Sequence, residues 1–141
     1  MQIIELIEKW FKKACSDLRT AFHMFYDIYP KEIEITCYHC QQAVEKVLKA
    51  YLLYHDIEPP YIHDLGALCK LCSEYDDKFI PLYTDCQKLT IYASMTRYPN
   101  NIEITEEETK IVLKKTYEIY NFVYGLIPGL DNDLRFPEEI K

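Results

Sequence analysis

The chain has 141 residues, 49% of them hydrophobic and only three of them glycine. This length supports one hydrophobic core, the apolar content argues against intrinsic disorder, and the scarcity of glycine argues against a turn-rich β-sandwich or barrel. The formal net charge of −7 weighs against bulk binding to nucleic acid, because non-specific phosphate contacts need a basic surface. No apolar run could span a bilayer and the first residues lack the basic start of a secretory signal, so we expect a cytoplasmic protein without membrane contact.

Apolar residues recur at steps of three and four near the start of the chain, which predicts a first helix of about six turns. Its stripe consists of Ile3, Ile7, Trp10, Ala14, Leu18, Ala21 and Phe25. A residue that precedes proline disfavours the α region, so this helix should end before Tyr29-Pro30.

A second helix is predicted over residues 37–55, with Thr36 as its N-cap. Gln41 and Glu45 flank its apolar stripe on one side, and Lys49 continues the polar face. The stripe itself consists of Cys37, Cys40, Val44, Val47, Leu48 and Tyr51.

Three further helices complete the pattern. A short helix begins near Asp64, and a longer one begins around Pro81, since proline is tolerated in a first helical turn. The last helix follows Thr105, where a glutamate three residues later completes a capping box. We therefore predict an all-α, up-and-down bundle of four main helices plus one short helix over residues 1–128. The acidic tail, residues 129–141, is expected to be frayed.

Six cysteines include two CxxC pairs, Cys37 with Cys40 and Cys69 with Cys72, a spacing that also occurs in zinc sites. Both pairs fall inside helical patterns, whereas zinc ribbons and knuckles place such pairs in tight turns. Buried cysteine behaves as a small apolar side chain. We therefore expect reduced cysteines packed in the core, with no metal or other cofactor; a zinc site and a disulfide are the alternatives.

Several short motifs follow one another in a fixed order along the chain. The first helix contributes Trp10, Ala14, Asp17-Leu18 and Ala21, and the second reads Tyr38-His39-Cys40-Gln41-Gln42-Ala43-Val44-Glu45-Lys46-Val47-Leu48-Lys49-Ala50. The third helix opens with His63-Asp64-Leu65, and the fourth closes with Arg97-Tyr98-Pro99. This ordered set resembles the HEPN domain, a family of small helical bundles often encoded beside a minimal nucleotidyltransferase. The resemblance covers roughly residues 5–127.

The resemblance implies a homodimer connected with nucleotide or RNA chemistry, with a minimal nucleotidyltransferase as a candidate partner. In toxin members of the family, ribonuclease activity rests on an Arg followed by a His after four to six residues. Arg97 stands at the Arg position here, but no histidine occurs after His63. RNA cleavage without a metal needs a group that moves a proton near neutral pH, which imidazole does and guanidinium does not. The sequence therefore contains no complete catalytic site of this type.

We expect any nucleotide or RNA phosphate to bind near Arg97, which would lie at a helix end before a loop. The other candidate ligand-binding residues are Tyr98, Gln42, Glu45, Lys49 and His63. Each has a structural alternative. Arg97 could cap helix carbonyls, the polar residues of the second helix could form a satisfied seam beside the core, and His63 could cap or orient the third helix.

Two functions compete. The first is a dimeric binding and assembly module that engages a nucleotide, an RNA or a nucleotidyltransferase partner without turnover of its own. The second is an RNA-cleaving component of a toxin–antitoxin pair that uses a non-standard site around Arg97. The missing histidine and the acidic charge favour the first. A homodimer is also expected because Ile91 and Tyr92 lie beside the core stripe of the fourth helix, where a second copy would cover them.

Overall fold

The computed structural model describes residues 2–95 and 103–136, and these stretches contain helices and no strands. Five α-helices and two short 3-10 helices follow one another along the chain. They are α1 (Ile3–Tyr26), α2 (Ile33–Tyr54), α3 (Leu65–Ser73), η1 (Asp77–Leu82), α4 (Tyr83–Met95), α5 (Glu106–Leu126) and η2 (Asn132–Leu134).

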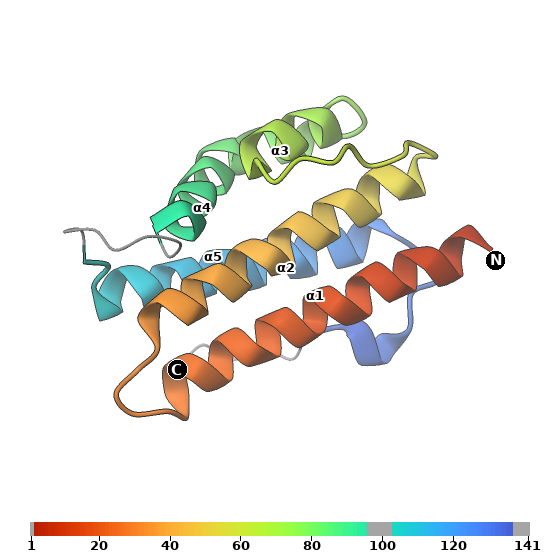
Figure 1. Cartoon of the computed structure of the whole chain (residues 1–141). Helices are drawn as coiled ribbons and strands as arrows, with labels where there is room; N and C mark the ends of the chain where they lie inside the picture. Colours follow the sequence, from red (N-terminus) through yellow and green to blue (C-terminus); the bar gives the residue numbers. More distant parts are fainter. Residues whose placement is uncertain (1, 96–102, 137–141) are drawn as a thin grey trace.

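The α2 helix lies at the centre of the bundle and contacts each of the other four α-helices. In Figure 1, α1 lies below α2, α3 and α4 lie above it, and α5 lies behind it. The four long helices α1, α2, α4 and α5 run in alternating directions along the bundle (Figure 1), as in an up-and-down topology. The predicted all-α bundle of four main helices and one short helix is confirmed.

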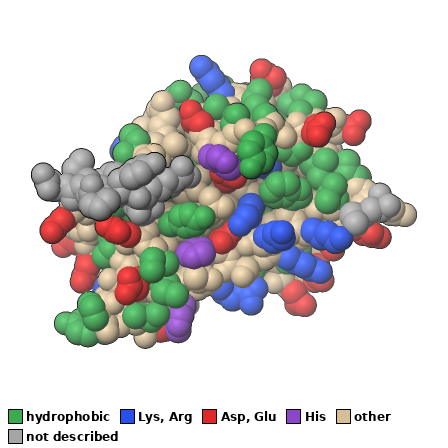
Figure 2. Space-filling model, in the orientation of Figure 1, with side chains coloured by type: hydrophobic (Ala, Val, Ile, Leu, Met, Phe, Trp, Pro, Cys, Tyr) green, Lys and Arg blue, Asp and Glu red, His purple; other side chains and the backbone are tan. Residues whose placement is uncertain are grey.

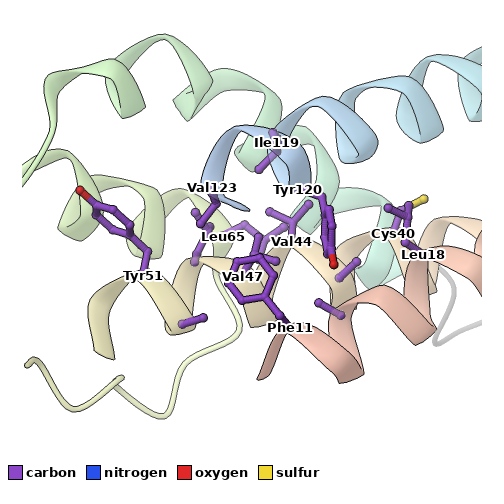
Figure 3. Packing of buried hydrophobic residues seen from close by; sticks show 14 of the residues in the cluster. Phe11, Leu18, Cys40, Val44, Val47, Tyr51, Leu65, Ile119, Tyr120 and Val123 are labelled. Atoms are coloured by element: carbon purple, nitrogen blue, oxygen red, sulfur yellow. The ribbon is translucent and has the colours of Figure 1, made fainter. Parts of the chain in front are cut away.

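Aromatic and aliphatic side chains from α1, α2, α3 and α5 meet in one core (Figure 3). The rings of Phe11 on α1 and Tyr120 on α5 pack edge to face, with centroids 5.6 Å apart. Phe79 of η1 packs against Tyr51 of α2 at 4.7 Å and Phe122 of α5 at 5.1 Å. Such pairs stabilise the fold beyond the area that they bury, so aromatic contacts tie the short elements to the long ones.

The predicted stripes of the first two helices are buried, with two exceptions in α1. Ile3 is exposed and Trp10 is only partly buried. In α2 the burial extends well beyond the stripe and includes Gln41, Glu45 and Lys49, so the expectation that Lys49 lies on a polar outer face is wrong. The reason is the central position of α2, which is covered by neighbours on several sides.

The start of α2 also differs from the prediction. The helix begins at Ile33, and Thr36 lies one turn inside it, fully buried, with its hydroxyl donating to the Glu32 carbonyl at 2.7 Å. Ile33 packs against the core, and this contact extends the helix beyond the residue that intrinsic capping preference would choose. Thr36 is therefore not the N-cap.

The predicted start of α3 and the predicted cap of α5 are confirmed. The Asp64 side chain accepts a hydrogen bond from the Ala67 amide at the start of α3. Thr105 and Glu108 form the capping box of α5. Pro81, however, belongs to the 3-10 helix η1, and α4 itself begins two residues later.

We expected the acidic tail to be frayed, but residues 129–136 are packed against the bundle. Leu130, Leu134 and Phe136 are buried, and the Tyr120 hydroxyl donates to the carbonyl of Leu134. The ring of Phe136 packs against Phe22 of α1, with centroids 5.2 Å apart. Residues 129–136 therefore pack on α1 and α5, with the apolar side chains inward and the acidic ones exposed.

Candidate functional site

Three polar side chains on one face of α2 form a buried chain of contacts. Gln41, Glu45 and Lys49 follow one another at steps of four residues, which places them on one face of the helix. The Gln41 amide donates to Glu45 Oε1 at 3.1 Å, and Lys49 Nζ lies 3.4 Å from Glu45 Oε2. The side chains of Glu45 and Lys49 are each only 7% exposed. The charged groups of this pair are thus almost entirely removed from solvent.

His63, from the connection between α2 and α3, completes the cluster. Its Nδ1 lies 3.0 Å from Glu45 Oε1, and its backbone carbonyl accepts from the Gln41 amide at 3.3 Å. A carboxylate can only accept, so Nδ1 carries the proton in this contact and Nε2 is left for another partner. The His63 side chain is 52% exposed, in contrast to the buried Glu45. The cluster therefore connects a buried carboxylate to an imidazole at the surface.

Gln42 and Tyr61 lie around the cluster. The Gln42 amide donates to Gln41 Oε1 at 2.8 Å. The ring of Tyr61 is 93% exposed, with its centroid 5.6 Å from the imidazole of His63 and 5.9 Å from Lys49 Nζ. We call Gln41, Gln42, Glu45, Lys49, Tyr61 and His63 the α2 polar cluster.

Four of the six candidate ligand-binding residues thus come together: Gln42, Glu45, Lys49 and His63. Arg97 and Tyr98 lie outside the described residues, so their distance to the cluster stays a prediction. Gln41 was singled out as part of a possible seam and takes a central place in the cluster. Tyr61 was not singled out, although its position two residues before His63 was a usable signal.

A second polar network bridges α1 and α2. The Asp17 carboxylate contacts His39 Nδ1 at 2.9 Å through one oxygen and Lys46 Nζ through the other. His39 and Lys46 are seven residues apart and share one face of α2. The His39 side chain is only 28% exposed, and through Asp17 it holds the two helices together.

Histidine, lysine and arginine side chains gather on the face of the molecule seen in Figure 2. Histidines lie over the middle and the lower part of this face, and a row of Lys and Arg side chains extends from its middle over α1. A local basic surface of this kind is compatible with an acidic chain, because the net charge does not determine the potential at one face.

The cysteines are buried side chains of the core, as the sequence predicted for both CxxC pairs. Cys37 and Cys40 are fully buried, and burial raises the pKa of the Cys37 thiol to about 11 and that of Cys40 further. All six cysteines are free thiols. Over residues 2–95 and 103–136, no group of three or more His, Cys, Asp or Glu side chains is placed to hold a metal. The absence of a bound metal in the protein stays a prediction.

Comparison with protein families gives a match to the model of the HEPN domain over residues 7–126. The chain belongs to the HEPN domain family. The match spans α1 to α5 and includes the α2 polar cluster. Neither the curated proteins nor the solved structures contain a match.

The HEPN assignment agrees with the geometry described above. The motif around the two glutamines of α2 and the His63-Asp64-Leu65 motif carried the resemblance, and these motifs supply both ends of the Glu45–His63 contact. HEPN domains often form dimers or pair with nucleotidyltransferases. Within the part of this HEPN chain that the structure describes, no helix is long and apolar enough to cross a membrane.

Proposed function

We propose that this HEPN domain is a binding and assembly module. It holds a nucleotide or an RNA phosphate at the α2 polar cluster and Arg97, acts as a homodimer, and pairs with a minimal nucleotidyltransferase without turnover of its own. The observation that carries the proposal is the buried Glu45–Lys49 pair joined to the exposed imidazole of His63.

A contribution to folding stability does not by itself explain why the Glu45–Lys49 ion pair is buried. Removing two charges from water costs several kcal/mol per ion, and apolar residues of similar size often do as well or better. Lys and Glu are almost never fully buried unless they are paired, so a buried pair that reaches a surface imidazole suggests a role other than packing. The Glu45–Lys49 pair fixes the carboxylate that in turn fixes the ring of His63. We therefore assign Glu45 and Lys49 positioning roles and His63 the contact with ligand.

The exposed groups of the cluster suit a nucleotide. With Nδ1 donating to Glu45, Nε2 of His63 can accept from an amino group on a base edge, and it can donate to a phosphate oxygen when the imidazole carries both protons. The exposed ring of Tyr61 offers a surface on which a base can stack. Arg97 would add a charge-assisted contact to phosphate. Phosphate recognition and base stacking together are typical of proteins that bind single-stranded nucleic acid.

The test is the affinity of the full chain for a fluorescein-labelled oligoribonucleotide, measured by anisotropy. Removing the contact in His63→Gln, or the charge in Arg97→Ala, should weaken binding roughly ten- to hundredfold. His23→Gln is the matched control, because His23 is also exposed and its Nδ1 lies 3.1 Å from a carboxylate, that of Asp27. Equal affinities for the native chain and all three variants would overturn the proposal.

One observation favours RNA cleavage as a second candidate function. A carboxylate that orients an imidazole through Nδ1 and leaves Nε2 free is the arrangement of a general base. His63 would replace the motif histidine that this chain lacks: it would take the proton of a 2′-hydroxyl, whose oxygen attacks the adjacent phosphorus, and would return that proton to the departing 5′-oxygen while Arg97 stabilised the charge on phosphate. Cleavage of a labelled RNA by the native chain and its loss in His63→Ala would support this function. An intact RNA bound by the native chain would leave only the binding function.

A further inference from the structure

The polar network between α1 and α2 has no part in the proposed function. The His39 imidazole contacts one oxygen of the Asp17 carboxylate through Nδ1 at 2.9 Å, and Lys46 Nζ contacts the other oxygen. Nδ1 therefore carries the proton in this contact, which leaves Nε2 for another partner. The ring of Tyr38, 38% exposed, packs edge to face against the imidazole, with centroids 5.3 Å apart. We call Asp17, Tyr38, His39 and Lys46 the Asp17 cluster.

The Asp17 cluster repeats the construction of the α2 polar cluster. There, too, the carboxylate of Glu45 contacts Nδ1 of a histidine, His63, through one oxygen and a lysine of α2, Lys49, through the other. An exposed tyrosine, Tyr61, again packs against the imidazole, with the two rings inclined at 67°, compared with 88° in the Asp17 cluster. Each cluster therefore offers the same two groups to a ligand, the Nε2 atom of an imidazole and an aromatic ring.

The two clusters are neighbours on the exposed side of α2. Gln42 lies three residues after His39 and three before Glu45, so the helical period places it next to both. Its side chain is half-buried and donates to Gln41 Oε1. Along the helix axis, six residues separate His39 from Glu45 by about 9 Å. The phosphates of a stacked strand are about 3.4 Å apart, so one strand of about four nucleotides or more can reach both clusters.

A link between the two helices does not account for the whole Asp17 cluster. The Asp17–Lys46 ion pair alone would join α1 to α2. The link needs neither the imidazole of His39, which stays partly exposed, nor the exposed ring of Tyr38 against it. These two groups are the ones that correspond to the proposed ligand contacts of the α2 polar cluster.

We propose that the Asp17 cluster is a second nucleotide subsite, so that the ligand of this domain is a single-stranded RNA that occupies both clusters and not a mononucleotide. This inference rests on the proposed function, because it adds a subsite to the α2 polar cluster. Nε2 of His39 contacts a base edge or a phosphate oxygen, and a base stacks on Tyr38. Asp17 and Lys46 are positioning residues that hold the imidazole. Two subsites on one strand reinforce each other, because the second contact forms at a high effective concentration once the first is made.

The test compares the affinities of the full chain for two RNA probes, a diuridylate and an octauridylate, each labelled with fluorescein and followed by anisotropy. His39→Gln should weaken binding of the octauridylate about tenfold, because the longer strand loses a contact in its second subsite. The same substitution should weaken binding of the diuridylate at most about twofold, because the α2 polar cluster remains available to it. If His39 only held the helices together, the two probes would lose affinity equally, and the inference would fail.

Tyr38→Ala tests the second subsite without removing a contact of Asp17, and it serves equally if His39→Gln does not fold. It should weaken binding of the octauridylate about tenfold through lost stacking. Tyr38→Phe keeps the ring and should bind as the native chain does. Tyr54→Ala is the matched control, because Tyr54 is also a tyrosine of α2 that is 38% exposed, and its affinity should be unchanged.

The outcomes separate this inference from the proposed function. A native affinity for the octauridylate in both His39→Gln and Tyr38→Ala, beside a loss in His63→Gln, would overturn the second subsite and leave the proposed function intact. A native affinity in His63→Gln and Arg97→Ala as well would overturn both.

Discussion

Glu45 is the residue on which the α2 polar cluster depends. Its two carboxylate oxygens contact Gln41, Lys49 and His63, and it is buried while His63 is half exposed. Each contact satisfies a polar group that would otherwise be costly to bury. The cluster is therefore a connected network, and removing one charge should leave the other uncompensated.

Lys49→Met should lower the free energy of unfolding by about 3 kcal/mol, because it leaves the Glu45 carboxylate buried without its cation. Adding Glu45→Leu should recover at least about half of this loss, since the uncompensated charge is then gone. Lys115→Met is the control, because Lys115 is exposed and its pair with Asp85 is long, at 3.8 Å. Its effect should stay within about 0.5 kcal/mol. Urea unfolding measures all three, and equal effects of Lys49→Met and Lys115→Met would contradict the assignment.

Burial of thiols also makes stability depend on pH. The pKa of Cys37 is about 11 in the folded chain, against an ordinary value of 9.0. An unfolded chain loses this proton first, so the stabilising contribution is fully present below about pH 9 and is lost as the pH rises towards about 11. The expected loss from Cys37 is on the order of 2 kcal/mol. Urea midpoints at neutral and alkaline pH should show the fall, and Cys37→Ala should make it shallower; identical slopes would exclude this cause.

At the scale of elements, the local sequence predicts a helix cap correctly where the surroundings are polar. It predicts the cap wrongly where a tertiary contact competes. Thr105 caps α5 as its motif predicted. Thr36 has the same chemistry but lies inside α2, because Ile33 packs against the core. Gln41, Glu45 and Lys49 are four residues apart, so the helical period alone places them on one face of α2. The contact of His63 with Glu45, eighteen residues away, depends on how the chain returns from α2 to α3.

The C-terminal segment shows the same competition. Its acidic side chains suggested fraying, whereas three apolar residues among them pack on α1 and α5. Phe136→Ala should lower the free energy of unfolding by about 2–3 kcal/mol, through lost burial and the cavity left behind. Asp133→Ala, on an exposed residue of the same segment, should change it by less than about 0.5 kcal/mol. Thermal and urea unfolding would show whether the two differ, and equally small effects would indicate a frayed tail.

At the scale of the whole molecule, apolar side chains are exposed on both α4 and η1. We infer the oligomeric state from those of α4. Ile91 on α4 is 58% exposed, beside the partly buried Tyr92. We expect the chain to form a homodimer that covers this surface. Light scattering at micromolar concentration should give a dimer for the native chain and a monomer for Ile91→Glu. Ile80→Glu is the control, because Ile80 is 61% exposed but lies on η1, and it should remain dimeric. A native monomer would contradict the expectation.

The proposed ligand site consists of the α2 polar cluster and Arg97. Two exposed surfaces compete for that role: the cluster with Tyr61 and His63, and a groove on α1 lined by Lys9, Trp10 and Lys13. Assigned NMR spectra of the full chain, titrated with a short oligoribonucleotide, distinguish them most directly. If the ligand binds at the proposed site, the signals of His63, Tyr61 and Arg97 should shift together and saturate at one affinity. Shifts confined to the α1 groove, or no shifts at millimolar RNA, would contradict it.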